Sequence, residues 1–170
     1  MEEHSKKLLE SAEKTANELI HKLKTSSITL ALAESCTAGI VSALLAGVPG
    51  ASEVLWGSFV TYTKEAKVSM LGIDEKIPET FGLVSRQTAC AMARGAVQKS
   101  GADAAAAVTG LAGPAGDGSD VPVGTVWVVA ASKKGEIMAN EHHFTGSRNE
   151  VRIKAAIAVL EILQTLLTKK

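Results

Sequence analysis

Cysteine is scarce in this chain of 170 residues. The two cysteines, Cys36 and Cys90, lie 54 positions apart and form no C-x-x-C pair. A disulfide scaffold and a cysteine-based zinc site are therefore excluded, since both need several cysteines at close spacing. We expect both thiols to be reduced, as they are in cytoplasmic proteins.

An excess of charge of one sign is also absent. The 18 Lys and Arg residues balance the 18 Asp and Glu residues, aromatic residues make up 4% of the chain, and no basic stripe is interleaved with aromatics. Nucleic-acid binders carry such a stripe to hold phosphates, so we expect no nucleic-acid partner. The balance favours small ligands, zwitterionic ones included.

Long apolar runs are missing as well. The N-terminal residues contain no signal-peptide core, and no stretch reaches the run of about 18 apolar residues that a membrane span needs. We therefore expect no membrane partner and a cytoplasmic location.

Apolar material is plentiful despite these absences. Hydrophobic residues make up 46% of the chain and charged residues 21%, which suits one domain over residues 1–170 with a single core. Apolar residues recur at helical spacing between Lys6 and Leu23, so we assign residues 1–25 to an amphipathic N-terminal helix.

Strand-like and helix-like segments alternate along the rest of the chain. The strands are predicted at 28–33, 54–61, 103–108, 124–131 and 136–144, and the helices at 38–46, 64–71, 85–99 and 147–168. Ser85 is placed to cap one helix, and Ser147 and Glu150 match a capping box for the last. Helices interleaved with apolar strands predict a three-layer α/β/α sandwich with a mixed, mostly parallel sheet of about five or six strands. The last two strands form an antiparallel pair.

A polar turn separates the first predicted strand from the helix at 38–46, at Ala33-Glu34-Ser35-Cys36-Thr37-Ala38-Gly39. Helix N-terminal N–H groups favour anions and oxyanions, and ligands of open α/β sheets bind beyond the carboxyl ends of strands. Two other strands also end in polar or glycine-rich segments, at 61–67 and 109–118. We expect the three segments to converge on one site.

Taken alone, these residues leave several interpretations open. A Ser35 nucleophile needs a base, none of the four histidines is suitably placed, and Lys64 and Lys67 share one helical face. Both lysines can equally be solvated charges, Ser35 and Thr37 helix caps, and Cys36 a small buried thiol. The turn does not match G-x-S-x-G, and the loop at 109–118 lacks the Lys-Ser/Thr ending of a P-loop.

Further segments follow in a definite order along the chain: Gly57-Ser58-Phe59-Val60-Thr61-Tyr62 with Glu65-Ala66-Lys67, Gly82-Leu83-Val84-Ser85, Thr109-Gly110-Leu111-Ala112-Gly113-Pro114, Pro122-Val123-Gly124-Thr125-Val126 and Phe144-x-Gly146-x-Arg148. Together with Ala33 to Gly39, they closely resemble the C-terminal domain of the CinA family over nearly the whole chain. The resemblance implies a stand-alone nicotinamide-nucleotide amidohydrolase. Such an enzyme hydrolyses the carboxamide of nicotinamide mononucleotide to nicotinate mononucleotide and ammonia, in pyridine nucleotide recycling.

The resemblance also implies roles for individual residues. Ser35 is the expected nucleophile, Tyr62 and Lys67 assist proton transfer, and no metal or cofactor is required. The residues expected to bind substrate are Glu34, Cys36, Thr37, Ala38, Gly39, Thr109, Gly110, Gly113 and Arg148. We expect backbone amides at the start of the helix at 38–46 to stabilise the oxyanion.

Two positions depart from the family pattern, which usually has glycine at Ala38 and asparagine at Lys64. We expect Lys64 either to lower the pKa of Lys67 or to face solvent. The alternatives to the implied function are a non-catalytic nucleotide-binding or regulatory module and an amidase for a different small amide. We also expect a homo-oligomer.

Overall fold

The computed structural model describes the backbone of residues 2–168 and the side chains of residues 5–168. Its sheet has the strand order β2-β1-β3-β4-β5. The strands are β1 Leu30–Glu34, β2 Leu55–Val60, β3 Ala104–Gly110, β4 Thr125–Ser132 and β5 Ile137–His143. Strands β2, β1 and β3 pair in parallel, and β4 is antiparallel to both of its neighbours. Four of the five strands therefore run in one direction, which confirms the mixed, mostly parallel sheet.

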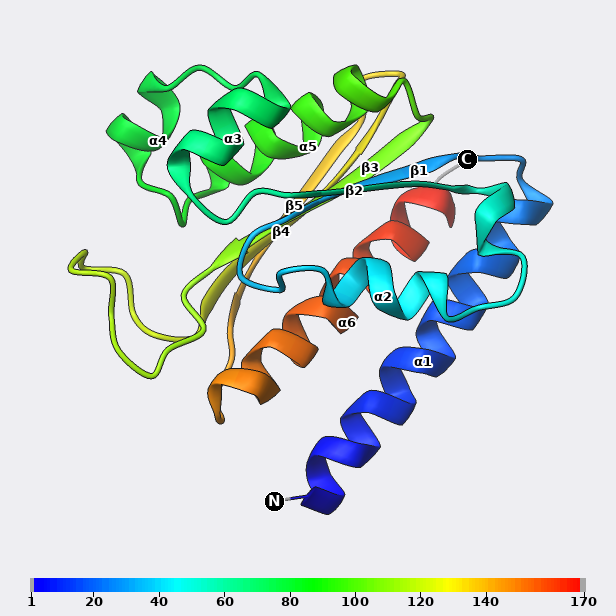
Figure 1. Ribbon diagram of the computed structural model, residues 1–170, viewed down its shortest axis with the longest axis horizontal. Helices are drawn as coiled ribbons and strands as arrows, with labels where there is room; N and C mark the ends of the chain where they lie inside the picture. The colour runs from blue at the N-terminus through cyan, green and yellow to red at the C-terminus, as the bar shows by residue number, and fades with distance from the viewer. Residues whose placement is uncertain (1, 169–170) are drawn as a thin grey trace.

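Helices cover both faces of this sheet (Figure 1). Helices α1 Glu2–Thr25, α2 Ile40–Ala46 and α6 Arg148–Thr168 lie on one face, and α3 Lys64–Leu71, α4 Lys76–Phe81 and α5 Arg86–Ser100 lie on the other. A short 3₁₀ helix, η1 Ala51–Glu53, precedes β2. The three layers confirm the predicted α/β/α sandwich.

The pleat of the strands divides the apolar core into two parts. In β1, Leu30 and Leu32 face the α1, α2 and α6 layer, whereas Ala31 and Ala33 face α5. Successive side chains of a strand point to opposite faces, so one strand can supply both cores. Alanines on the α5 side let that helix lie close to the sheet. This packing fixes the carboxyl ends of β1, β2 and β3, from which the polar turns project.

Helix caps predicted from the sequence are present in the structure. The Ser85 hydroxyl accepts from the Thr88 amide at 3.1 Å. The Glu150 carboxylate accepts from the Ser147 amide at 2.7 Å, and the Glu150 amide donates to the Ser147 hydroxyl at 3.4 Å. These contacts fix the start of α6, where Arg148 lies, because they satisfy N–H groups that a helix leaves without partners.

The structure differs from the sequence prediction at three places. The strand predicted at 28–33 is β1 and begins at Leu30, and β3 continues to Gly110, two residues beyond the predicted end. Helix α4 was not predicted at all; it has only six residues and contains Pro78, so it carries no readable periodicity.

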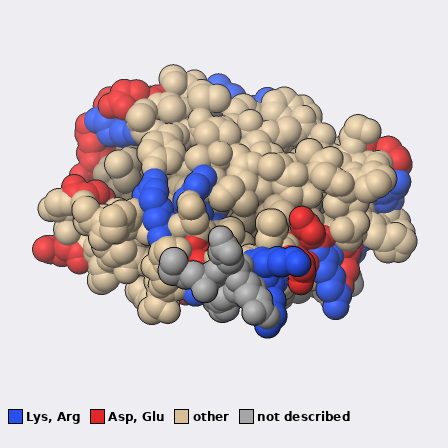
Figure 2. Space-filling model, turned by 60° about the horizontal axis from the view of Figure 1, so that its bottom comes forward, with Lys and Arg blue, Asp and Glu red and all other residues tan. Residues whose placement is uncertain are grey.

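Charges of both signs are mixed on the face shown in Figure 2. Lys and Arg side chains there lie next to Asp and Glu side chains in several places, and uncharged residues cover much of the surface between them. Within residues 2–168, no helix is both long enough and apolar enough to cross a bilayer.

Candidate active site

The three polar segments meet at the carboxyl ends of the parallel strands. Ser35 directly follows β1, Tyr62 follows β2, and Thr109 and Gly110 end β3. With Lys67 from α3 and Arg148 from α6, they line a cavity of about 170 Å³. The remaining lining residues are Cys36, Leu83, Val84, Leu111, Ala112 and Asp117. This is the edge at which open α/β sheets bind ligands.

The central contact of the cavity joins Lys67 to Ser35. The Lys67 Nζ lies 3.0 Å from the Ser35 Oγ and donates at 2.8 Å to the Thr61 carbonyl. Lys67 is 1% exposed, and its burial lowers the amine pKa from 10.5 to about 8. A substantial fraction of Lys67 is therefore neutral in mildly alkaline solution and able to accept the proton of the hydroxyl that it contacts.

The Glu34 carboxylate holds the turn from beneath. Its two oxygens accept five hydrogen bonds, from the amides of Gly39, Val41 and Ser42 and the hydroxyls of Thr37 and Ser58. Glu34 is 1% exposed and does not line the cavity. Glu34 was expected to bind substrate, but in this position it anchors the N-terminus of α2 instead.

This arrangement corrects the expected source of the oxyanion hole. The amides at the start of α2 point to the Glu34 carboxylate and are not available to a substrate. The backbone amides of Cys36 and Thr37, by contrast, donate to no oxygen atom of the described residues. These two N–H groups follow the Ser35 hydroxyl directly and are the better candidates for stabilising an oxyanion.

Arg152 holds the same turn from the other side. Its Nε donates to the Cys36 carbonyl at 3.1 Å and its Nη2 to the Thr37 carbonyl at 2.9 Å. Because both carbonyls are fixed, the peptide planes that carry the amides of Thr37 and Ala38 are fixed too. Arg152 lies one helical turn after Arg148 on α6, a spacing that would have indicated it in the sequence.

Arg148 joins two segments at the cavity, the turn after β2 and the loop after β3. Its Nη2 donates to the Tyr62 hydroxyl at 2.8 Å, and its Nη1 donates to the Gly113 carbonyl at 2.6 Å. A guanidinium has five N–H donors, so the group keeps capacity for an anionic ligand. Thr109 uses its hydroxyl to hold the Leu83 carbonyl at 2.9 Å, which fixes the segment that forms the opposite wall.

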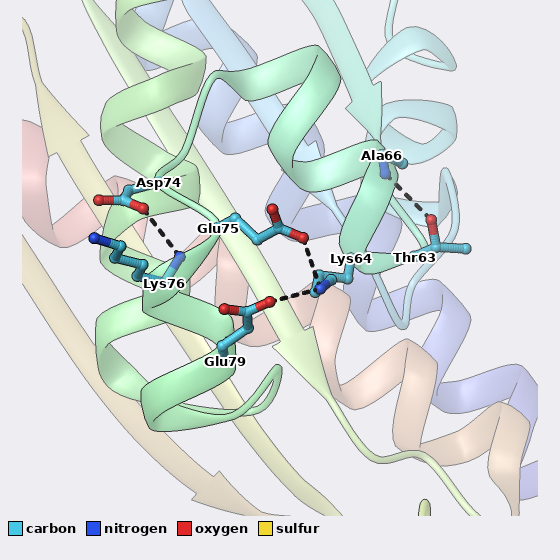
Figure 3. Close-up of polar contacts among 7 residues, drawn as sticks. All are labelled: Thr63, Lys64, Ala66, Asp74, Glu75, Lys76 and Glu79. Carbon is cyan, nitrogen blue, oxygen red and sulfur yellow. Dashed lines mark hydrogen bonds and ion pairs between the residues drawn. The ribbon is translucent and has the colours of Figure 1, made fainter.

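Of the two outcomes expected for Lys64, the structure has the second: its side chain is 30% exposed, and its amine is paired at the surface. Its amine contacts Glu75 at 2.8 Å and Glu79 at 3.0 Å, and these carboxylates raise its pKa above the ordinary lysine value (Figure 3). Burial, and not Lys64, is the cause that lowers the pKa of Lys67. Lys64 therefore joins α3 to α4 and leaves Lys67 undisturbed.

Cys36 and the histidines offer no competing chemistry in this geometry. Cys36 is 5% exposed, and burial raises its thiol pKa to about 11, so little thiolate exists at neutral pH. His142 and His143 lie on β5 and do not line the cavity. Within the described residues, no cluster of three or more His, Cys, Asp or Glu side chains could hold a metal ion.

Comparison with known proteins shows the family and the fold of the chain. Residues 12–167 match the family model of the CinA C-terminal domain. A CinA-like protein of Geobacter metallireducens is 42% identical over 141 residues, covering 83% of this chain and 34% of the relative. One from Mycobacterium tuberculosis is 39% identical over 154 residues, covering 91% and 36%. The chain thus spans about a third of the length of these curated relatives.

Solved structures agree as well. The competence/damage inducible protein CihA from Agrobacterium tumefaciens superposes with a TM-score of 0.89 at 38% identity, covering 92% of this chain and 95% of that one. A CinA superfamily protein from Klebsiella pneumoniae gives a TM-score of 0.90 at 28% identity, covering 94% and 99%. The chain belongs to the CinA family. Its resemblance to the C-terminal domain, inferred from the motifs, is confirmed.

Most site residues predicted for this CinA domain converge on the cavity: Ser35, Cys36, Tyr62, Lys67, Thr109, Gly110 and Arg148 line it. Glu34, Thr37, Ala38 and Gly39 lie in the supporting turn and not in the lining, and Gly113 contributes only its carbonyl, to Arg148. Five lining residues were not among the predicted site residues: Leu83, Val84, Leu111, Ala112 and Asp117. Asp117 lies within the glycine-rich loop at 109–118, but no motif singled it out.

Proposed function

We propose that this CinA domain hydrolyses the carboxamide of nicotinamide mononucleotide to nicotinate mononucleotide and ammonia, with Ser35 as nucleophile. The observation that carries the proposal is the 3.0 Å contact between the Ser35 hydroxyl and the buried Lys67 amine. A serine attacks an amide only when a base takes its proton, and a lysine with a lowered pKa is such a base.

The proposed reaction has two halves. The Ser35 Oγ attacks the carboxamide carbon as its proton passes to neutral Lys67, and the amides of Cys36 and Thr37 stabilise the oxyanion. The protonated Lys67 then returns the proton to the leaving nitrogen, which departs as ammonia and leaves an acyl ester on Ser35. Water, deprotonated by the same amine, cleaves the ester. An oxyanion donor typically contributes about 3 to 4 kcal/mol, and positioned proton transfer about 100-fold to 10,000-fold in rate.

The charges of the cavity suit a nucleotide substrate. Arg148 has N–H groups left for a phosphate after its contacts with Tyr62 and Gly113. Tyr62 is 52% exposed at the cavity mouth, where its hydroxyl can join the proton relay or the substrate contacts. The pyridinium ring withdraws electrons from the carboxamide and makes its carbon easier to attack.

The test is an assay of purified protein with nicotinamide mononucleotide in a chelating buffer, in which ammonia and nicotinate mononucleotide are measured together. Wild type should release both in equal amounts, and Ser35→Ala should release neither while keeping its circular dichroism spectrum. Ser42→Ala is the matched control, because it removes a nearby serine hydroxyl that does not line the cavity.

Other outcomes of this assay separate the alternatives. Substantial residual activity in Ser35→Ala contradicts the nucleophile assignment. Ammonia from another small amide but not from nicotinamide mononucleotide indicates an amidase of different specificity. Binding without turnover indicates the nucleotide-binding module. The cytoplasmic location and the homo-oligomer stay predictions, to be tested by fractionation and by sedimentation.

A further inference from the structure

The cavity that contains Ser35 holds one carboxylate beside its two cationic groups. Among the described residues that line it, Asp117 is the single acidic side chain, and Lys67 and Arg148 are the basic ones. Asp117 lies in the loop between β3 and β4. In the described structure no ion pair joins it to either basic group, so the carboxylate is not there to neutralise them.

The carboxylate of Asp117 contacts Ser119 through one of its oxygens. Its Oδ1 accepts from the Ser119 amide at 3.0 Å and from the Ser119 hydroxyl at 2.6 Å. These bonds lower the pKa of Asp117 below its ordinary value, so the group is ionised at neutral pH.

We propose that Asp117 is a substrate-binding residue that selects a cationic aromatic ring by facing its positive charge. The inference rests on the proposed function and deepens it. In nicotinamide mononucleotide the charged ring nitrogen and the carboxamide belong to the same six-membered ring. When the carboxamide carbon lies at the Ser35 Oγ, the ring charge must lie in the same cavity as Asp117. With the phosphate at Arg148, the protein charges mirror those of the zwitterionic substrate.

The proposal predicts discrimination between two ligands that differ in ring charge. Reduced nicotinamide mononucleotide has the same phosphate, ribose and carboxamide, but its dihydropyridine ring is neutral. Asp117 attracts the positive ring of the oxidised form, and the neutral ring of the reduced form does not receive this charge attraction. A partly solvated charge pair of this kind changes affinity by about fivefold.

The experiment is calorimetric titration of both ligands into three proteins that all carry Ser35→Ala to prevent turnover. The first has no other change, the second adds Asp117→Asn, and the third adds Asp120→Asn. Asparagine keeps the Oδ1 acceptor, so the contacts to Ser119 and the loop conformation are preserved. Asp120 is the matched control because it lies in the same loop and does not line the cavity.

The expected result is a loss of about fivefold in affinity for the oxidised ligand in Asp117→Asn, with binding of the reduced ligand unchanged and Asp120→Asn like the parent. Equal losses for both ligands, no loss for either, or no binding of the oxidised ligand to the parent would overturn the proposal. Turnover by the Ser35-containing protein is measured separately. Hydrolysis without charge discrimination refutes this inference alone, and discrimination without hydrolysis refutes the proposed function alone.

Discussion

Two side chains near Ser35, Glu34 and Lys67, are buried to the same extent but receive very different numbers of hydrogen bonds. Glu34 and Lys67 are each 1% exposed. The Glu34 carboxylate receives five hydrogen bonds, three of them from backbone amides. Among the described residues, the Lys67 amine has the Thr61 carbonyl and the Ser35 hydroxyl as hydrogen-bond partners, and no carboxylate. A buried charged group that receives many hydrogen bonds from the protein stabilises the local structure. A buried amine with few hydrogen-bond partners loses its proton more readily.

Lys64 completes the comparison from the same helix. It lies three residues before Lys67 and has the two carboxylates that Lys67 lacks, so the pKa values of the two amines move in opposite directions. Both amines belong to lysines of α3. What differs is that carboxylates contact the Lys64 amine, whereas the Lys67 amine is buried without one among the described residues. The following predictions test this contrast.

Replacing Lys67 by methionine should have the largest effect. We expect Lys67→Met to lower kcat/KM for nicotinamide mononucleotide by about 100-fold to 10,000-fold, the usual contribution of a positioned base. Lys67→Arg should not restore activity, because a guanidinium does not lose its proton. Initial rates of ammonia release measure the loss, and urea unfolding shows whether each variant is folded. A folded Lys67→Met enzyme with near wild-type rates would show that another group is the base.

Glu34→Gln tests the structural half of the contrast. The amide nitrogen of glutamine would face donors that now point to a carboxylate oxygen, at least two of them at either position. We expect a loss of about 3 kcal/mol in the free energy of unfolding, measured in urea, because buried donors are left without acceptors. Ser58→Ala removes one donor and should cost about 1 kcal/mol. An unchanged Glu34→Gln stability would contradict the anchoring role.

The pH dependence should follow Lys67 alone. In the proposed mechanism the neutral amine is the base, and its pKa is about 8, so kcat/KM should rise about tenfold per pH unit below that value and level off above it. Folded Lys67 loses its proton near pH 8, whereas an unfolded lysine keeps it to about 10.5. The unfolded state therefore binds more protons between these values, and Lys67 makes the wild type gain stability with rising pH relative to Lys67→Met. The absence of this difference would refute the assigned pKa.

Lys64→Met should have the smallest effect. The amine that it removes lies at the surface between α3 and α4, so we expect kcat/KM to change by less than about twofold. The urea midpoint should fall slightly in low salt, and the difference from wild type should shrink in 1 M salt, the concentration at which charges are screened within about 3 Å. A large loss of activity with intact stability would mean that Lys64 does act on Lys67.

The order of strands and helices was readable from the sequence because the apolar patterns of most elements are strong. Helix α3 was predicted at the residues where it forms, 64–71. The strand order was not readable, since nothing local indicates that β1 lies between β2 and β3. Helix α4 packs against α5 with Pro78 buried, and the surface contacts of Lys64 with Glu75 and Glu79 join it to α3, but it has no periodic apolar face.

Within the site, the motifs identified the residues but not their environments. The spacing of Lys64 and Lys67 gave both lysines the same status, and only tertiary packing decides which of them is buried. Glu34 belonged to the same motif as Ser35, and its direction along the strand determines that it solvates α2 and not a ligand. The sequence shows which chemical groups are available to a site. The burial of each group and its hydrogen-bond partners depend on the whole fold.

Helix α6 has a consequence for how the protein matures. Arg148 and Arg152, both on α6, complete the cavity wall and fix the turn after Ser35. Every other element described here leaves the ribosome before α6 does, so the segments that contain Ser35 and Lys67 are made before the two arginines that hold the turn and the cavity wall. Completion of the cavity is then a late event of folding, reached when α6 packs against the sheet. A chain synthesised only to the end of β5 would contain Ser35 and Lys67 but lack the contacts of Arg148 and Arg152.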